Sequence, residues 1–337
     1  MSNPVSPSPA LAFDTINAHQ KTAVIKAAIE LQIFTHIASG ADRASEIAAR
    51  CDAAERGIRI LCDTLTVFGF LNKTSDTYQL TAESAAFLDA KAPAYIGGAV
   101  EFLLSPLLTS NFDHLTSAVR KGGTSQTVLG TIAPDHPIWI QFARAMGPMM
   151  IAPAHALAQW SALETPHAGK VLDISASHGM WGISLAQKHS GIHLVALDWA
   201  PVLEVTRENA DRAGLADRFT TIPGNAFEVD LGSDYDIVLI PNFLHHFNTD
   251  DCIRFLTKVH AALKDGGRVA IVEFVPNADR VTPPDAARFA LVMLVSTPEG
   301  DAYTAHEYES MLKQAGFKTP IMQSLPPSFA TAIVARK

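Results

Sequence analysis

The residues best suited to bind a ligand lie in one short stretch, where two aspartates flank a turn of small residues. Asp173 lies near the end of a β-branched apolar run, and Asp198 closes a second apolar run at 194–197. Between them, a turn at 175–179 leads into a helical pattern over 180–188. This order predicts a βαβ unit, in which an acidic residue about twenty positions beyond the turn binds a ribose diol. We therefore predict a nucleoside site at the carboxyl ends of these strands.

The turn also restricts which nucleoside fits. Dinucleotide folds use G-x-G-x-x-G, so that the backbone can approach a pyrophosphate at the helix N-terminus. Here Ser175 and Ser177 occupy the first two glycine positions, and their side chains would crowd a pyrophosphate. S-adenosylmethionine, which has adenine and ribose but no phosphate, fits these residue types better. A sheet turn without a ligand is the alternative.

Length and composition indicate the number of domains and limit the partners that the chain can have. A chain of 337 residues predicts two domains, and 48% hydrophobic residues suit a large core or an extensive subunit interface. The net charge of −8 argues against nucleic acid as a partner. Cys51, Cys62 and Cys252 lack ligand spacing, so we expect neither a disulfide framework nor a metal site.

The chain also lacks the signals of a membrane or secreted protein. No run of eighteen apolar residues occurs, and residues 1–10 are typical of a disordered tail rather than a signal peptide. We therefore expect a cytoplasmic protein that does not bind a membrane.

The elements before the nucleoside unit follow a winged-helix order. Helical patterns over 11–37, 44–50 and 54–69 precede an alternating stretch at 70–81 that predicts a hairpin. A DNA-binding regulator is one interpretation, but the third helix carries Arg56 and Arg59 among mostly apolar residues and lacks a basic footprint. We favour a helical, winged-helix-like dimerisation domain over 11–160 that contributes to the substrate pocket, followed by a catalytic domain over 161–337. The predicted boundary is a linker near 161–169, which contains the turn residues Pro166 and Gly169.

Two later helices carry apolar stripes. The helical pattern at 136–160 contains aromatic and methionine side chains that indicate either core or the wall of a pocket. A helix at 284–295 places Phe289 and Met293 on one face. The predicted pocket wall consists of Trp139, Phe142, Met146, Met149, Phe289 and Met293.

An ordered set of motifs resembles a known family. These are LDW at 197–199, PGNAF at 223–227, FLHHF at 243–247, DGGRVAIVEF at 265–274 and TPEGDAYT at 297–304. Together they resemble the plant-type O-methyltransferases and their bacterial natural-product branch, from about residue 11 to the end. The resemblance implies a class I methyltransferase fold, a doubly wound α/β fold with a mostly parallel seven-stranded sheet, Rossmann-like, whose last strand is antiparallel. It also implies a homodimer formed by the N-terminal domain and S-adenosylmethionine as methyl donor.

By motif position, the resemblance assigns the donor site residue by residue. The turn from Asp173 through Ser175 to Gly179 would hold the methionine end, Asp198 would bind the ribose hydroxyls, and Asn225 and Phe227 would flank the adenine. The remaining predicted cofactor residues are Trp199, Ala226 and Asn242.

The resemblance also assigns catalytic groups. The family's catalytic histidine falls on His245, and the glutamate that orients it falls on Glu273. A neutral imidazole, with an unperturbed pKa of about 6.5, can take the proton of a phenol as general base. The family's second glutamate falls on Ala302, so Asp301 is the expected substitute. His246 replaces the aspartate that follows the histidine in the family, and we count it with the substrate residues. Because adjacent side chains in a loop usually point apart, we expect at most one of the two rings to reach the acceptor.

The sequence therefore predicts an S-adenosylmethionine-dependent O-methyltransferase that acts on a small aromatic hydroxyl compound and releases S-adenosylhomocysteine. Alternatives are N- or C-methylation, an enzyme of the same fold that transfers no methyl, and a structural dimer with an inactive site.

Overall fold

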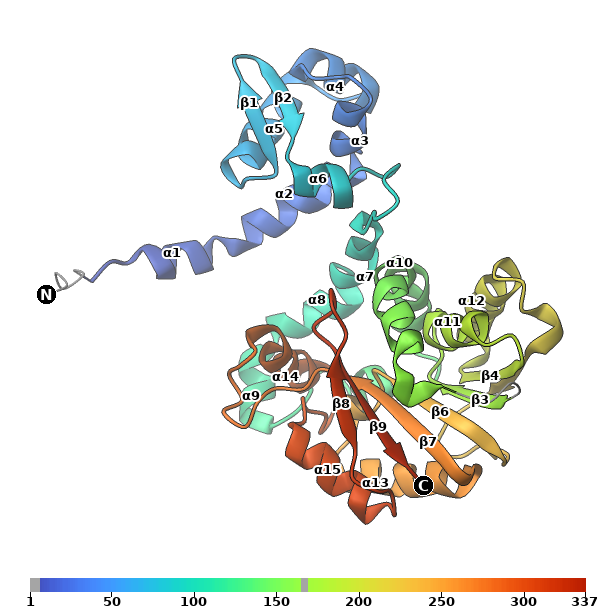
Figure 1. Cartoon of the computed structure of the whole chain (residues 1–337). Helices are drawn as coiled ribbons and strands as arrows, with labels where there is room; N and C mark the ends of the chain where they lie inside the picture. The colour runs from blue at the N-terminus through green and yellow to red at the C-terminus, as the bar shows by residue number, and fades with distance from the viewer. Residues whose placement is uncertain (1–6, 165–168) are drawn as a thin grey trace, which may run out of the picture. The chain divides into compact units, whose positions relative to one another are not determined.

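The computed structural model describes residues 7–164 and 169–337, shown in Figure 1. The chain forms two compact units, residues 1–100 and 101–337. The predicted tail lies largely outside the described residues, as does Pro166 of the predicted linker. The units divide between Val100 and Glu101, whereas the sequence analysis placed the domain boundary after Trp160.

The first unit begins with three helices in place of the single predicted helix over 11–37. These are α1 (Ala10–Ile16), α2 (Ala18–Glu30) and α3 (Ile33–Ala38). Gln32 breaks the last junction because its φ of 51° is left-handed and ends the helical path of the backbone. The prediction of one continuous helix is therefore wrong.

The rest of the first unit follows the predicted order. Helices α4 (Ala44–Cys51) and α5 (Glu55–Val67) precede the antiparallel strands β1 (Leu71–Thr74) and β2 (Thr77–Leu80), which confirms the predicted hairpin. Helix α6 (Ala82–Phe87) and a 3-10 turn η1 (Gly97–Ala99) complete it. Ile58, Cys62 and Leu65 of α5 are buried at helical spacing, so one apolar face of this helix enters the core of the unit.

The second unit opens with helices that lead to the sheet. They are α7 (Val100–Leu103), α8 (Pro106–Asp113), α9 (Leu115–Lys121), η2 (Gly130–Ile132), the long helix α10 (Ile138–Gln159) and η3 (Ser161–Leu163). Helix α10 packs against α11 (Met180–Lys188) and α12 (Ala200–Arg212) of the α/β portion. This packing assigns the apolar stripe of α10 to the second unit.

A seven-stranded sheet organises the second unit, in the order β5-β4-β3-β6-β7-β9-β8 (Figure 1). All pairs are parallel except those made by β9, which is antiparallel to both neighbours. The strands are β3 (Gly169–Ile174), β4 (Ile192–Asp198), β5 (Phe219–Pro223), β6 (Tyr235–Pro241), β7 (Leu263–Glu273), β8 (Ile321–Ser324) and β9 (Thr331–Arg336). The predicted fold class is confirmed.

Helices cover both faces of this sheet because the central strands are apolar on both sides. Val171 of β3 packs with Leu157 and Trp181 on one face, and Leu172 packs with Phe255 on the other. The remaining elements are η4 (Ala216–Arg218), η5 (Leu244–His246), α13 (Thr249–Ala262), α14 (Pro284–Ser296) and α15 (Ala305–Gln314). Within the described ranges, no helix combines the length and apolar character needed to span a membrane.

Candidate active site

A cavity of about 610 Å³ adjoins the carboxyl ends of β3, β4 and β6 within the second unit. Most of the predicted site residues line it, whereas Asp173, Gly179, Glu273, Met149 and Asp301 do not. The predicted residues in its wall are Trp139, Phe142, Met146, Ser175, Asp198, Trp199, Asn225, Ala226, Phe227, Asn242, His245, His246, Phe289 and Met293.

The turn after β3 keeps the backbone of a glycine-rich loop although two of its residues are serines. Ser175 and Ser177 both have φ values of 53°, and Gly179 has a φ of 77°. The backbone N–H of Ala176 donates to the carbonyl of Leu197 over 3.1 Å, which ties the turn to the end of β4. The serine side chains therefore stand on a backbone that closely follows what glycine would adopt.

Asp173, near the end of β3, connects the strand to the helix that follows the turn. Its Oδ2 accepts a hydrogen bond of 3.0 Å from the backbone N–H of Gly182 on α11. A Cβ at position 182 would come 2.7 Å from that oxygen, so glycine permits the approach of helix to strand. Oδ1 of Asp173 is buried without a hydrogen-bond partner among the described residues. Burial, together with the nearby Asp198, raises the pKa of Asp173 well above its usual range.

Asp198 ends β4 at the cavity wall. Its Oδ2 accepts from the backbone N–H of Ser177 over 2.9 Å, and its Oδ1 accepts from that of Trp199 over 2.7 Å. Burial raises the pKa of Asp198 to about 6, although these two hydrogen bonds oppose the shift. The carboxylate is thus oriented at the cavity wall, and each of its oxygens can accept a further hydrogen bond from a hydroxyl group.

Beyond Asp198, the cavity is bounded by the loop after β5. The backbone N–H of Phe227 donates to Oδ1 of Asn225 over 3.0 Å, and the ring of Phe227 packs 4.7 Å from that of Phe247. Asn242, after β6, has a φ of 51° and a buried Oδ1 without a partner among the described residues. Together with Oδ1 of Asp173 and the buried Oγ of Ser177, this leaves three unpaired oxygens around the turn and its neighbouring loop. Such a set fits the amino, hydroxyl and adenine groups of an adenosine-based donor.

His245 and Glu273 form a buried pair at the other part of the cavity. Nδ1 of His245 lies 2.5 Å from Oε2 of Glu273, and the two side chains are 4% and 0% exposed. Oε1 of Glu273 accepts from the backbone N–H groups of Phe243 and His245 over 3.1 and 3.3 Å. Because the carboxylate holds the proton on Nδ1, Nε2 carries the free lone pair.

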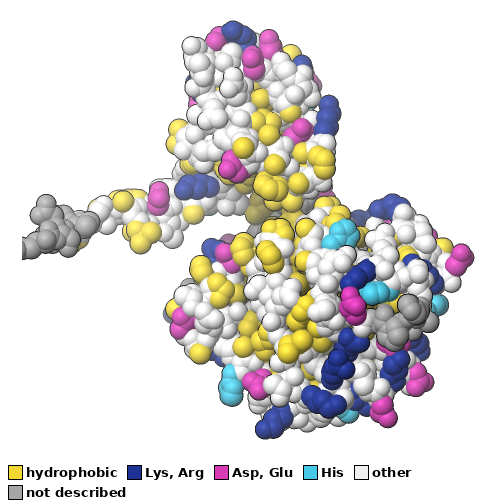
Figure 2. All heavy atoms as spheres, viewed as in Figure 1, with side chains coloured by type: hydrophobic (Ala, Val, Ile, Leu, Met, Phe, Trp, Pro, Cys, Tyr) yellow, Lys and Arg dark blue, Asp and Glu magenta, His cyan; other side chains and the backbone are white. Residues whose placement is uncertain are grey.

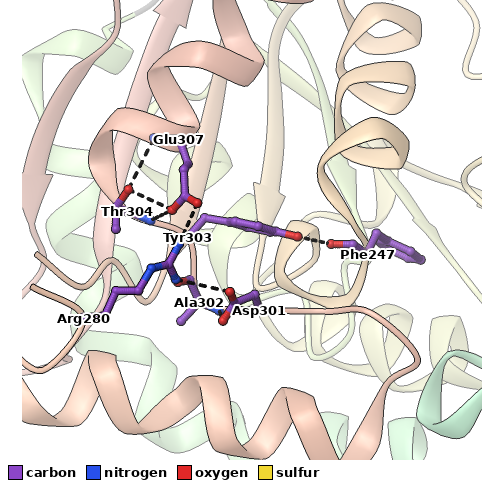
Figure 3. A network of polar contacts seen from close by, with 7 residues as sticks. All are labelled: Phe247, Arg280, Asp301, Ala302, Tyr303, Thr304 and Glu307. Atoms are coloured by element: carbon purple, nitrogen blue, oxygen red, sulfur yellow. Dashed lines mark hydrogen bonds and ion pairs between the residues drawn. The ribbon is translucent and has the colours of Figure 1, made fainter. Parts of the chain in front are cut away.

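Asp301 does not take the place of the family's second glutamate. Its Oδ2 pairs with Arg280 over 3.2 Å, and Arg280 also binds Glu307, as Figure 3 shows. The backbone N–H of Asp301 donates to the carbonyl oxygen of His245 over 3.0 Å, so only its main chain touches the histidine. The prediction of a carboxylate beside the imidazole is therefore corrected: the side chain turns outward to Arg280.

The loop at 297–304 nevertheless supports the histidine loop. A Cβ at Gly300 would collide with the carbonyl oxygen of His245. The hydroxyl of Tyr303 donates to the carbonyl of Phe247 over 2.5 Å (Figure 3). These contacts hold the 297–304 loop against the backbone of the loop that carries His245.

Aromatic rings form the remaining wall. Trp139 contacts His246 and Phe142, with ring centroids 5.2 and 6.2 Å apart, and Phe142 stacks on His178 at 5.9 Å. Phe289 packs edge-on against His245 at 4.7 Å. Met150 lines the cavity in place of Met149, because successive residues of a helix point about 100° apart.

The sequence analysis missed several parts of the wall, among them Phe102, Leu103 and Leu108 of α7 and α8, and Ser328 and Ala330 before β9. A further part comes from the segment before α10 and includes Leu129, Thr131, Ile132 and Pro134. The hydroxyl of Thr131 donates to the carbonyl of Ser296 over 3.1 Å, which attaches this segment to the end of α14. Its apolar residues were the only signal, and they show no period that would have singled them out.

The described residues contain no group of three or more His, Cys, Asp or Glu side chains placed to hold a metal ion. Cys51, Cys62 and Cys252 are free thiols.

Comparison with known proteins identifies the family. Residues 112–318 match the O-methyltransferase domain, and residues 13–90 match the O-methyltransferase dimerisation domain. A 3-hydroxy-5-methyl-1-naphthoate 3-O-methyltransferase of Streptomyces sahachiroi is 28% identical over 319 residues, which cover 93% of this chain and 90% of that protein.

Solved structures agree with this result. A candidate O-methyltransferase from Nostoc punctiforme is 52% identical, with a TM-score of 0.95 over 98% of this chain and 100% of that one. PigF of Serratia, solved with S-adenosylhomocysteine (SAH), is 23% identical and shares the fold, with a TM-score of 0.83 over 98% and 100% of the two chains. Because the O-methyltransferase domain matches more than half of its residues, the chain belongs to the O-methyltransferase family.

Proposed function

We propose that this protein methylates a hydroxyl group of a small aromatic compound, with S-adenosylmethionine as donor and His245 as general base. The observation that carries the proposal is the buried His245–Glu273 pair, 2.5 Å apart, whose histidine lines a cavity of about 610 Å³ that Asp198 also lines. An imidazole held by a carboxylate at one nitrogen presents a basic nitrogen at the other.

The donor is held by the residues around the turn after β3. Asp198 would accept from the ribose hydroxyls, the 175–179 turn, which Asp173 supports from the end of β3, would hold the methionine end, and Asn225 and Phe227 would flank the adenine. When bound, the donor would supply an activated methyl group: the acceptor oxygen would bond to the methyl carbon as the carbon–sulfur bond breaks, and the sulfur would leave in S-adenosylhomocysteine. The same residues leave little room for a pyrophosphate, because Ser175 and Ser177 carry side chains where dinucleotide folds have glycine.

His245 supplies the acid–base chemistry. Its Nε2 removes the proton of the acceptor hydroxyl, whose ordinary pKa is about 10, as the oxygen becomes nucleophilic. Glu273 stabilises the imidazolium that forms, through the hydrogen bond from Nδ1. Positioning of the acceptor by the aromatic wall adds the larger part of the rate, since well-oriented reactants can gain roughly 7–11 kcal/mol.

The acceptor is aromatic and largely apolar because of the surfaces that face it. Trp139, Phe142, Phe289 and Met293 line the cavity beside the catalytic histidine loop. Pockets of this kind bind flat apolar molecules and use a few polar groups to orient them.

The test combines donor binding with turnover. Calorimetry with SAH should detect binding to the wild type, and a panel of phenols should be methylated when S-adenosylmethionine is supplied. His245→Ala should lower kcat about 10²- to 10⁴-fold and retain SAH binding. His306→Ala, at an exposed position on α15, is the matched control. Unchanged turnover in His245→Ala would reject the base assignment, and transfer to nitrogen or carbon would reject O-methylation.

The proposed assembly is a homodimer formed by the N-terminal domain. Residues 13–90 match the dimerisation domain of the family. Leu11, Phe13 and Ile16 of α1 are 80%, 61% and 69% exposed, and Figure 2 shows hydrophobic side chains along this segment. Apolar side chains of this size on one short helix are stabilised when a partner covers them.

A further inference from the structure

Among the described residues, three histidines line the cavity, and only one of them serves as the proposed base. The other two are His178, in the turn after β3, and His246, next to the base. Each imidazole can donate or accept a hydrogen bond, and which it does depends on the nitrogen that carries the proton. The surroundings of each of the three rings indicate which of its nitrogens carries the proton.

His178 is a neutral donor. The backbone N–H of Met180 donates to its Nδ1 over 3.1 Å, so the proton of the ring lies on Nε2. Burial lowers the pKa of His178 to about 4, so the ring carries no charge near neutral pH.

His246 is a neutral donor for a different reason. Its Nδ1 is buried without a hydrogen-bond partner among the described residues, so Nε2 is the nitrogen left to face the cavity. A buried N–H without an acceptor loses its hydrogen bond altogether, whereas a proton on Nε2 can meet a ligand or water. Burial, together with His245, lowers the pKa of His246 well below its usual value and keeps the ring uncharged.

His245 presents a hydrogen-bond acceptor to the cavity, whereas His178 and His246 present donors. Because Glu273 holds the proton on Nδ1, the cavity meets the lone pair of Nε2. The rings of His245 and His246 both line the cavity, with centroids only 4.2 Å apart, contrary to the expectation that at most one of the pair reaches the acceptor. An accepting nitrogen and a donating nitrogen therefore face neighbouring positions of whatever molecule binds there.

We infer that His246 is a specificity-determining residue that donates a hydrogen bond to a neutral carbonyl-type oxygen adjacent to the reacting hydroxyl. The inference rests on the proposed function and names its substrate class, aromatic compounds with a hydroxyl next to a ketone, ester, amide or quinone oxygen. His245 takes the proton of the hydroxyl, and His246 binds the adjacent oxygen.

The charges around the cavity favour a neutral oxygen over a carboxylate. No lysine or arginine is found among the described residues that line it, while Asp198 and Glu228 are. An anionic group beside His246 would be buried without a cation, which is costly in an apolar site.

The experiment compares three probes that differ at one position: 2-hydroxyacetophenone, 2-ethylphenol and salicylate. Binding to the protein saturated with SAH is measured by calorimetry, and turnover with S-adenosylmethionine is measured in parallel. The wild type should bind 2-hydroxyacetophenone about ten- to a hundredfold more tightly than 2-ethylphenol, and salicylate more weakly than the ketone. His246→Phe, which keeps a ring against Trp139 but removes the donor, should bring the ketone-to-ethyl ratio close to one.

Two further variants complete the test. His246→Asn retains an N–H donor and should restore part of the ratio, and His306→Phe at an exposed position should leave the ratio as in the wild type. Equal affinity of the wild type for ketone and ethyl compound, a ratio that survives in His246→Phe, or a preference for salicylate would overturn the inference. Binding decides it even where no probe is methylated, and absence of any methylation would count against the proposed function instead.

Discussion

Glu273 holds the proton on the far side of the imidazole, and this gives a direct test at the residue scale. In Glu273→Gln the negative charge that stabilises the imidazolium is lost, and kcat should fall about 10²-fold or more. SAH affinity should change less than threefold, because Glu273 does not line the cavity. Steady-state kinetics and calorimetry check both expectations, with Glu309→Gln on the exposed side of α15 as control. Full activity in Glu273→Gln would show that the base needs no carboxylate.

The proposed contact of Asp198 with the donor predicts that donor binding depends on pH. Burial raises its pKa to about 6, so the ionised form that accepts from a ribose is lost as the pH falls through 6. SAH affinity should therefore decrease below pH 6, by at most about tenfold per pH unit, and binding near pH 6 should release protons. Calorimetry at pH 6 and 8 in buffers of different ionisation enthalpy measures this release. An affinity that rises toward low pH would contradict the assignment.

The same carboxylate affects folding with a defined sign. Its pKa is higher in the folded state than in the unfolded chain, so the folded state binds more protons between about pH 4 and 6. Its contribution to the free energy of unfolding therefore decreases as the pH rises through that window, and the full cost, about 3 kcal/mol, applies above pH 6. A bound donor whose ribose hydroxyls donate hydrogen bonds to this carboxylate would offset part of the cost.

At the scale of elements, the loop at 297–304 positions the histidine loop through its backbone. Gly300→Ala should destabilise the protein by about 1–3 kcal/mol and reduce kcat, because the added methyl group collides with the carbonyl of His245. Asp301→Asn should reduce kcat less than threefold, because its carboxylate binds Arg280 rather than the imidazole. Thermal unfolding and kinetics of the two variants measure the difference. A larger loss in Asp301→Asn than in Gly300→Ala would return Asp301 to the catalytic group.

The sequence predicted the elements whose motifs are local. The βαβ unit around Asp173 and Asp198 could be read from apolar runs and small residues, and the family resemblance pointed to His245 and Glu273 together. Met149 could not be told from Met150, because both lie on the apolar side of α10 and only the rotation of the helix decides which reaches the cavity. Asp301 was assigned from its position in a motif. The motif cannot show that the side chain of Asp301 binds Arg280, 21 residues earlier in the chain.

At the scale of the whole molecule, the sequence does not reveal which unit a helix joins. Helix α10 belongs with the α/β portion because it packs against α11 and α12, a contact between distant parts of the chain. A linker rich in turn residues near 161–169 was the visible signal, but the units divide at Val100. Composition marks where a chain can turn, whereas packing decides where a compact unit begins.

The proposed dimer gives the prediction at this scale. Replacing Leu11, Phe13 and Ile16 together by serine should convert the dimer to a monomer or weaken it at least tenfold, because these side chains are exposed within the first unit. Light scattering coupled to size-exclusion chromatography measures the mass as the protein is diluted. Val281→Ser, an equally exposed apolar position in the second unit, is the control. A dimer as stable as the wild type would exclude α1 from the interface.

The two serines in the turn after β3 have a thermodynamic consequence. A residue other than glycine held at a positive φ costs of order 1–3 kcal/mol, and Ser175 and Ser177 both remain there. The empty enzyme therefore sits higher in energy than a glycine version of the same loop would. Hydrogen bonds from the two serine hydroxyls to a bound donor would offset this strain. The Tm of the protein should therefore rise as the donor site is filled.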